Sequence, residues 1–281
     1  MGKVIFGDSR DMREVSNESV GLVLSSPPYY NAPYDFPDLF RDYRSYISTL
    51  REVLFEVRRV LQRGRAAVFV VQDVRIDGEL YPITADLISL AREIGLRYQD
   101  RIIWRKPEGY IRISRRSGVF VQHPYPLYFY PDNVYEDVLV FRKEGKPQLI
   151  NREESKVDLN LFQREKWYLS VWELTNVLPS QRWSKFTAAF PEELAKRVIT
   201  LYSCVGDVVL DPFLGTGTTA AVARALRRDF VGYEVDLELE EVIRERVGEA
   251  EVVKRSDAKR LRTTLKAAVT KRTPSDSSPS L

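Results

Sequence analysis

Residues 26–29, Ser-Pro-Pro-Tyr, are of types that could act on the exocyclic amine of a nucleobase. That amine is a poor nucleophile, because its lone pair is delocalised into the ring, so a catalyst needs acceptors for both N–H hydrogens. The hydroxyl of Ser26 can accept one. Pro28 brings no donor and biases Pro27 toward extended backbone, which leaves the Pro27 carbonyl free for the other. Tyr29 offers a ring face for a base extruded from a duplex, so these four residues are the catalytic candidates.

A second string, residues 211–219, reads Asp-Pro-Phe-Leu-Gly-Thr-Gly-Thr-Thr and predicts a ligand-binding loop. An apolar run leads into Asp211, and open α/β sheets bind ligands at the carboxyl ends of their strands. Gly215 and Gly217 can adopt positive φ and let a ligand lie against the backbone. Alone, either string fits an ordinary turn of an α/β sheet. Their occurrence together favours a shared site.

Nearby residues narrow the class of ligand. A phosphate-binding loop needs Gly-Lys followed by Ser or Thr, and this loop has no lysine. A dinucleotide-binding loop usually has a third glycine where Ala220 stands, although alanine is tolerated there. Glu234 ends the next predicted strand, about 20 residues on, where a carboxylate would meet a ribose diol. A nucleoside cofactor is therefore the favoured ligand.

The loop and the tetrapeptide together resemble the S-adenosylmethionine-dependent amino-methyltransferases that modify nucleic acids. The resemblance covers most of residues 3–247 and implies S-adenosyl-L-methionine as the cofactor. Residues 186–191, Phe-Thr-Ala-Ala-Phe-Pro, resemble a further cofactor-contacting segment of that family. The cofactor-binding residues implied in this way are Asp8, Thr187, Asp211, Phe213, Gly215, Gly217, Thr218 and Glu234.

The order of the two strings resembles the circularly permuted β group of the family, because the acceptor precedes the cofactor loop. In that arrangement Asp8 contacts the cofactor's adenine, with Asp257 as the alternative. A serine in the first acceptor position, as in Ser26, usually accompanies methylation of cytosine N4, whereas aspartate often accompanies adenine N6. Methylation at cytosine C5 would need a cysteine nucleophile, and Cys204 is better interpreted as a small buried hydrophobe.

Apolar periodicity predicts strands alternating with helices, which is typical of an α/β fold with a doubly wound, mostly parallel Rossmann-like sheet. Gly64 and Gly95 are expected to end the first two helices. The expected strands are 20–25, 66–71, 102–104, 138–141, 207–211 and 229–234, and the expected helices are 38–61, 81–94, one that begins at 191, 216–227 and 258–269.

Four segments follow from this pattern and from composition. Residues 144–170 are polar and patternless, and the tail from 273 lacks apolar residues and is expected to be disordered. The segments are a catalytic half (1–143), a short insertion or target-recognition region (144–183), a cofactor-binding half of the same domain (184–269) and a disordered tail (270–281).

A basic stretch with interleaved aromatic residues could contact phosphates and stack on bases, although a solvated loop fits equally well. Tyr125, Tyr128, Phe129 and Tyr130 could line a base pocket or pack in the core. His123 and the tryptophans at 167, 172 and 183 are interpreted as structural. The nucleic-acid-binding candidates are Arg105, Lys106, Tyr110, Arg112, Arg115 and Arg116.

Composition excludes several classes of protein. The 281 residues contain one cysteine, which excludes a disulfide framework and a cysteine-based zinc site, and no metal is expected. No apolar run approaches the roughly 20 residues that a membrane helix needs, and a cytoplasmic location is expected. The sequence thus predicts a methyltransferase for cytosine N4 in DNA or structured ribosomal RNA. Adenine N6 methylation, a non-catalytic nucleic-acid binder, a nicotinamide-dependent oxidoreductase and a methyltransferase for free small-molecule amines are the alternatives.

Overall fold

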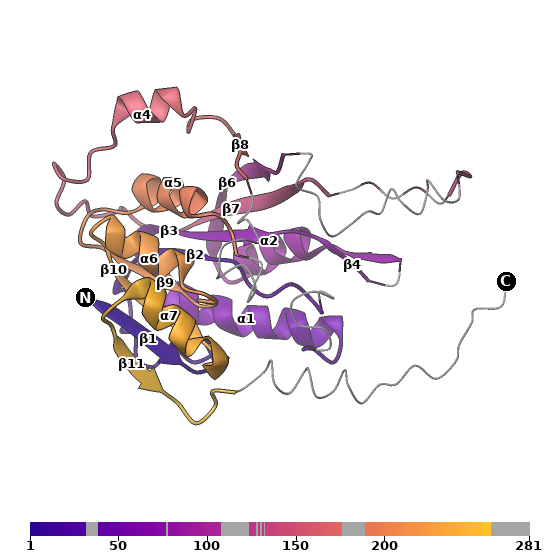
Figure 1. The fold of residues 1–281 in the computed structure, drawn as a ribbon, viewed down its shortest axis with the longest axis horizontal. Coiled ribbons are helices and arrows are strands. Elements are labelled where there is room, and N and C mark those ends of the chain that lie inside the picture. The colour runs from indigo at the N-terminus through magenta and orange to yellow at the C-terminus, as the bar shows by residue number, and fades with distance from the viewer. Residues whose placement is uncertain are drawn as a thin grey trace.

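Nine strands of the described chain form one sheet (Figure 1). This computed structural model describes residues 1–31, 39–76, 78–107, 124–127, 129, 131, 133–175 and 189–259. β7 runs antiparallel to both of its neighbours, and the other pairings in this sheet are parallel. From one edge to the other the strands are β11 (Glu251–Lys254), β1 (Gly2–Phe6), β10 (Asp229–Glu234), β9 (Val208–Asp211), β2 (Val20–Ser25), β3 (Leu61–Val71), β7 (Tyr135–Lys143), β6 (Leu96–Arg105) and β8 (Val171–Glu173).

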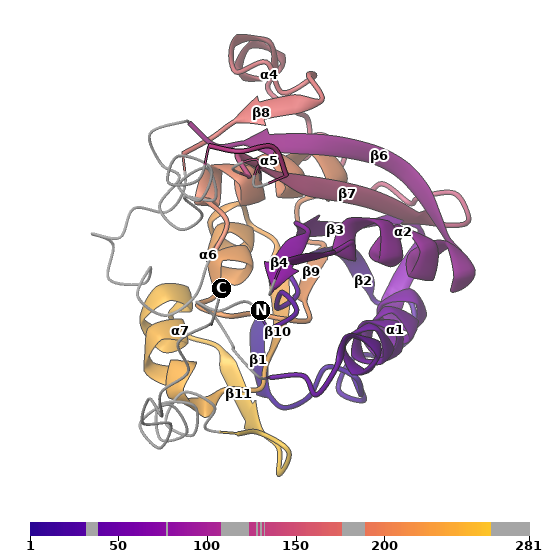
Figure 2. The ribbon, with the colours of Figure 1, turned by 90° about the vertical axis from the view of Figure 1, so that its right-hand side faces the viewer.

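Helices cover both faces of the sheet (Figure 2). Alternate residues of a strand point to opposite faces. In β2, Val23 packs in the cluster that contains α1 and α2, whereas Leu22 and Leu24 pack in the cluster that contains α5, α6 and α7. The predicted α/β, Rossmann-like fold is therefore confirmed. The bounds of these helices are α1 (Tyr43–Val60), α2 (Ile83–Glu93), α5 (Glu192–Tyr202), α6 (Thr218–Ala225) and α7 (Glu240–Val247).

Two predictions about α1 are wrong, the residue at which it begins and the glycine that ends it. The helix expected over 38–61 begins only after Asp42, whose carboxylate accepts the backbone N–H of Ser45 at 2.7 Å. Gly64 does not end this helix. It lies inside β3 with φ of 74°, and a Cβ there would come within 2.4 Å of the backbone nitrogen of Pro147. The glycine is needed for this close approach of two chain segments and not for a helix terminus.

The segment 144–170, expected to be patternless, contains helix α4 (Leu159–Arg164). Asp158 caps it by accepting the N–H of Asn160 at 2.9 Å. Periodicity could not indicate α4, because none of its residues is buried. Beyond it, β8 pairs with β6, so part of the predicted insertion 144–183 continues the main sheet.

The other elements expected within the described residues are present with shifted ends, and several additions were not foreseen. The strands expected at 102–104 and 138–141 extend to the full lengths of β6 and β7. The additions are a hairpin of β4 (Val74–Ile76) and β5 (Glu79–Tyr81), the 3-10 turn η3 (Leu237–Leu239), and β11 at the sheet edge.

Trp167, Trp172 and Cys204 are buried, as expected. Tyr125 and Phe129 are 65% and 61% exposed, so neither packs in the core. Within the described ranges, no helix has the length and apolar character needed to cross a membrane. Predictions that concern Tyr110, Arg112, Arg115, Arg116, His123, Tyr128, Tyr130, Trp183, Thr187, most of 258–269 and the tail 270–281 lie outside the described residues.

Candidate active site

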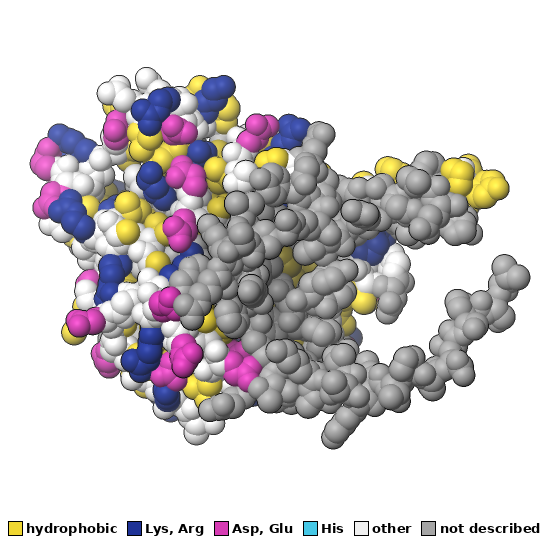
Figure 3. All heavy atoms as spheres, viewed as in Figure 1, with side chains coloured by type: hydrophobic (Ala, Val, Ile, Leu, Met, Phe, Trp, Pro, Cys, Tyr) yellow, Lys and Arg dark blue, Asp and Glu magenta, His cyan; other side chains and the backbone are white. Residues whose placement is uncertain are grey.

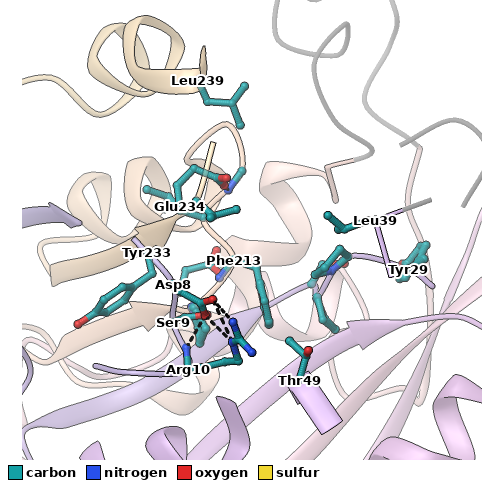
Figure 4. A pocket seen from close by; sticks show the side chains of 18 of the residues that line it. Asp8, Ser9, Arg10, Tyr29, Leu39, Thr49, Phe213, Tyr233, Glu234 and Leu239 are labelled. Atoms are coloured by element: carbon teal, nitrogen blue, oxygen red, sulfur yellow. Dashed lines mark hydrogen bonds and ion pairs between the residues drawn. The ribbon is translucent and has the colours of Figure 1, made fainter. Parts of the chain in front are cut away.

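A cavity of about 560 Å³ lies along the carboxyl ends of four adjacent parallel strands, β1, β10, β9 and β2 (Figure 4). The chain passes from β9 to β10 on one side and from β2 to β3 on the other, so the strand order reverses between β9 and β2. Ligands of open α/β sheets bind at such a switch point. Residues 26–29 and 211–216 both line this cavity, so the structure brings the two predicted motifs together.

Asp211 joins the two motifs through its buried carboxylate. One oxygen, Oδ1, accepts the hydroxyl of Ser25 at 2.5 Å and the N–H of Phe213 at 3.0 Å. The other, Oδ2, accepts the hydroxyl of Thr219 at 2.6 Å. Burial raises the pKa of Asp211 to about 6, against the lowering effect of these hydrogen bonds. Since Ser26 follows Ser25 directly, the carboxylate of Asp211 fixes the end of β2 against the glycine loop.

The glycine loop has the backbone conformation that the sequence analysis expected. Gly215 and Gly217 have φ of 55° and 87°, in the left-handed region that favours glycine. Gly217 precedes α6 directly and does not line the cavity, whereas Gly215 does. Thr218 also lines it, and its buried hydroxyl has no hydrogen-bond partner in the described part of the protein. A buried unpaired hydroxyl is costly, so a polar ligand at this position would satisfy it.

Glu234, at the end of β10, supports the loop from its other side. Its two carboxylate oxygens accept the N–H groups of Gly215 and Asp236, each at 2.8 Å. Burial raises the pKa of Glu234 to about 7, although these hydrogen bonds lower it. Each oxygen can accept a further hydrogen bond, so the predicted contact with ribose hydroxyls stays compatible with this arrangement.

Asp8 lines the cavity at the end of β1, and Asp257 is not among the described residues that line it. Asp257 instead accepts the backbone N–H of Asp8 at 3.3 Å. Arg10 donates to both carboxylate oxygens of Asp8, with a shortest distance of 2.6 Å (Figure 4). Burial raises the pKa of Asp8, but the hydrogen bonds from Arg10 outweigh it and the net pKa is lowered. The geometry favours Asp8 over Asp257 as the residue that reaches a ligand.

Arg105 and Lys106, the two predicted nucleic-acid-binding residues that the structure describes, both form ion pairs within the protein but differ in exposure. Arg105 is half exposed and pairs with Glu173 at 3.3 Å. The ammonium of Lys106 pairs with Glu136 at 2.5 Å, and its side chain is 15% exposed. This pairing does not fit the predicted phosphate contact, because the charge of Lys106 is already neutralised inside the protein. On the face shown in Figure 3, charges of both signs are interspersed over the described part, which agrees with a net charge of only +3.

Three functional candidates were missed by sequence reasoning. Each makes a hydrogen bond to a predicted site residue: Arg10 to Asp8, Ser25 to Asp211, and Glu136 to Tyr29. Glu136 lies 107 residues from Tyr29 in the chain. The position of Ser25 beside Ser26 was a usable signal. Nothing in the spacing of the sequence indicates Glu136.

Comparison with known proteins settles the family. The model of a DNA methylase family, the N6/N4 methyltransferases, matches residues 20–245. The chain belongs to this family. It is 32% identical to the type II methyltransferase M.MjaI of Methanocaldococcus jannaschii, across 88% of this chain and 91% of that protein. It is 25% identical to the DNA adenine methyltransferase YhdJ of Escherichia coli, across 84% of this chain and 79% of that protein.

A solved structure gives the same result. The protein TTHA0409 of Thermus thermophilus, in complex with S-adenosyl-L-methionine, superposes with a TM-score of 0.73 at 29% identity, over 90% of this chain and 98% of that one. Members of the family are S-adenosylmethionine-dependent methyltransferases, so the predicted cofactor and class of enzyme are confirmed. Family membership argues against the nicotinamide-dependent oxidoreductase.

Proposed function

We propose that this protein transfers a methyl group from S-adenosyl-L-methionine to the exocyclic N4 of cytosine in DNA. The observation that carries the proposal is the shared cavity of the acceptor loop 26–29 and the glycine loop. The two loops follow adjacent strands, so a donor held by one would face an amine held by the other. Proximity and orientation of this kind account for much of the rate in a group transfer.

The residues present fit the cofactor. Gly215 gives backbone access, Thr218 has an unsatisfied hydroxyl, and Asp8 and Glu234 end neighbouring strands with carboxylates toward the cavity. Phe213 adds an apolar surface. When bound, the cofactor supplies a methyl group already activated by a sulfonium.

The chain's own residues would prepare the amine. The Ser26 hydroxyl and the Pro27 carbonyl accept its two hydrogens, which turns the nitrogen lone pair out of the ring plane. The Asp211–Ser25 hydrogen bond holds this loop in register with the cofactor side. The methyl group is already activated, so alignment and a preorganised polar environment are sufficient and no strong base is required.

Cytosine N4 is proposed because Ser26 occupies the first acceptor position. The similarity to YhdJ, named a DNA adenine methyltransferase, makes adenine N6 the second candidate. We assign the chain to the circularly permuted β group. In support, β2 precedes β9 in the chain by more than half its length, yet pairs with it in the sheet. DNA is preferred to RNA as the substrate, because the family is described as DNA methylases and YhdJ is named a DNA adenine methyltransferase.

A nucleoside assay tests the proposal. The protein is incubated with cofactor and either unmethylated bacterial DNA or ribosomal RNA, and the digested nucleosides are identified by mass spectrometry. We expect N4-methyldeoxycytidine, and none from Ser26→Ala. N6-methyladenine as the sole product would refute the cytosine assignment, and modified RNA alone would refute DNA as the substrate. No product and no saturable cofactor binding would favour a non-catalytic binder.

A further inference from the structure

The hydroxyl of Tyr29 is held away from solvent by a residue outside both motifs. It donates to Glu136 Oε2 at 2.6 Å, and both residues are only 8% exposed. Glu136 lies on β7, while Tyr29 follows β2 in the acceptor loop. The ring of Tyr29 lines the cavity (Figure 4), so this bond fixes a cavity wall from behind.

The other oxygen of Glu136 is also engaged. Oε1 pairs with the ammonium of Lys106 at 2.5 Å, and that ammonium lies 5.1 Å from the ring centroid of Trp104. Lys106 directly follows β6 and carries the only cation that pairs with Glu136 among the described residues. The carboxylate of Glu136 is therefore held from two sides, by the ammonium of Lys106 and by the hydroxyl of Tyr29.

The neighbouring tyrosine is anchored independently. The ring of Tyr30 packs against those of Tyr43 and Tyr81, with centroids 5.2 and 4.8 Å away. The loop backbone therefore has an apolar anchor of its own, separate from the bond between Tyr29 and Glu136.

We propose that Glu136 is a positioning residue, which holds the ring of Tyr29 in the plane that receives the extruded base, and that the ion pair with Lys106 holds Glu136 in place. The inference rests on the proposed function, because it needs a base to stack on Tyr29. It assigns to β7 and the end of β6 a direct part in preparing the acceptor loop.

The test separates positioning from folding. Glu136→Leu removes the acceptor but leaves the Lys106 ammonium buried and unpaired, which destabilises the fold. The double variant Glu136→Leu with Lys106→Met replaces the whole pair by apolar groups, which restores charge balance. The readouts are thermal unfolding, cofactor affinity by calorimetry, and the single-turnover rate on unmethylated phage DNA at saturating cofactor and DNA.

We expect the double variant to unfold at a higher temperature than Glu136→Leu, although below the wild type because the hydroxyl of Tyr29 loses its bond to Glu136, and to bind cofactor normally. Its single-turnover rate should stay about tenfold slow, a size typical of losing one orienting contact. Tyr29→Phe should be equally slow, and adding it to the double variant should cause no further loss, since both changes break the same bond. Glu136→Gln combined with Lys106→Met, which keeps an acceptor and leaves no unpaired ammonium, should recover most of the rate. Tyr30→Phe is the matched control and should match the wild type.

Recovery of the wild-type rate in the double variant would mean that Glu136 is merely structural. A wild-type protein that methylates DNA no faster than Tyr29→Phe would overturn this inference alone. A wild-type protein that binds cofactor but modifies no base would overturn the proposed function and this inference with it.

Discussion

Two pairs of buried carboxylates differ in their partners: Asp211 and Glu234 lie beside the cavity at the ends of β9 and β10, and Glu136 and Asp137 lie on β7 toward the far edge. Beside the cavity, Asp211 and Glu234 accept only hydroxyl and backbone N–H groups in the described structure. On β7, Glu136 pairs with Lys106, and Asp137 pairs with Arg101 at 2.7 Å.

The two pairs differ in whether a cation lies beside the carboxylate. Burial raises the pKa of Asp211 and of Glu234, while the neutral hydroxyl and N–H donors around them lower it. Carboxylates with cationic partners are already neutralised and serve to hold side chains in place. Asp211 and Glu234 therefore have no cation beside them in the described structure, whereas Glu136 and Asp137 have one each.

Asp211→Ala should have the largest effect. It leaves the hydroxyl of Ser25 buried without its acceptor, at a cost of about 1–3 kcal/mol. It also removes an acceptor from the half-buried N–H of Phe213 and from the hydroxyl of Thr219, which keeps a longer contact with the carbonyl of Leu24 at 3.4 Å. We expect a clear fall in unfolding temperature, weaker cofactor binding and methylation slowed by at least about 100-fold. Thermal unfolding, calorimetry and the nucleoside assay measure these three quantities.

Asp137→Ala is the matched change in the other region. Its partner Arg101 is 45% exposed and can turn to water, and one buried hydroxyl, that of Thr84, loses its bond to Asp137. Stability should therefore fall less and cofactor affinity should not change. Equal losses of cofactor affinity in both variants would contradict the comparison.

Gly217→Ala should have the next largest effect on stability and on cofactor affinity. With φ of 87°, an alanine there is strained by roughly 1–2 kcal/mol, and its Cβ would lie 3.1 Å from Val247 Cγ1. We expect lower stability together with about tenfold weaker cofactor binding, because the glycine loop shifts. Gly78→Ala is the control, because its φ is 86° and no atom lies within 4 Å of its Cβ position. It should lose similar stability and keep full cofactor affinity; weaker cofactor binding in Gly78→Ala would show that the strain acts globally.

The pH dependence of stability should differ between carboxylates with neutral and with cationic partners. Burial raises the pKa of Glu234 to about 7, so between about pH 4 and pH 7 the folded state binds more protons than the unfolded state. Stability from this group therefore falls as pH rises through that window. The unfolding temperature of the wild type relative to Glu234→Gln should be higher at about pH 5 than at about pH 7.5.

For Asp8 the stability should change with pH in the opposite direction. Burial raises its pKa, but the hydrogen bonds from Arg10 outweigh burial and the net pKa is lowered. The wild type should hold an advantage over Asp8→Asn above about pH 4, and lose it as pH falls further. The same slope for Asp8→Asn and Glu234→Gln would show that burial alone controls both groups.

Arg105→Ala should have the smallest effect. Arg105 and Glu173 are both largely exposed, and exposed pairs contribute about 0–1 kcal/mol, so stability should hardly change. If Arg105 contacts phosphate, the KM for DNA should rise a few-fold and the salt dependence of binding should weaken. Titrations of DNA binding against salt measure this. An unchanged salt dependence would assign Arg105 to the ion pair alone.

The sequence predicted the parts of this protein whose signal is local. The alternation of strands and helices, the glycine loop and the tetrapeptide are each contained in a short window, and each was recognised. Partners distant in the chain were not, because periodicity carries no information about which strand lies beside which. The pairing of Tyr29 with Glu136 and the burial of Lys106 depend on the antiparallel placement of β7 between β3 and β6. Helix α4 was missed for a different reason, since it buries no side chain and leaves no apolar pattern.

The placement of β1 has a consequence for how the chain folds. β1, at residues 2–6, lies between β10 and β11 and so finds its sheet neighbours more than 220 residues later. Contacts so distant in sequence form slowly, and during synthesis they must wait for the last part of the sheet to emerge. During synthesis residues 26–29 would therefore emerge long before β9 and β10, the strands whose ends complete the cavity.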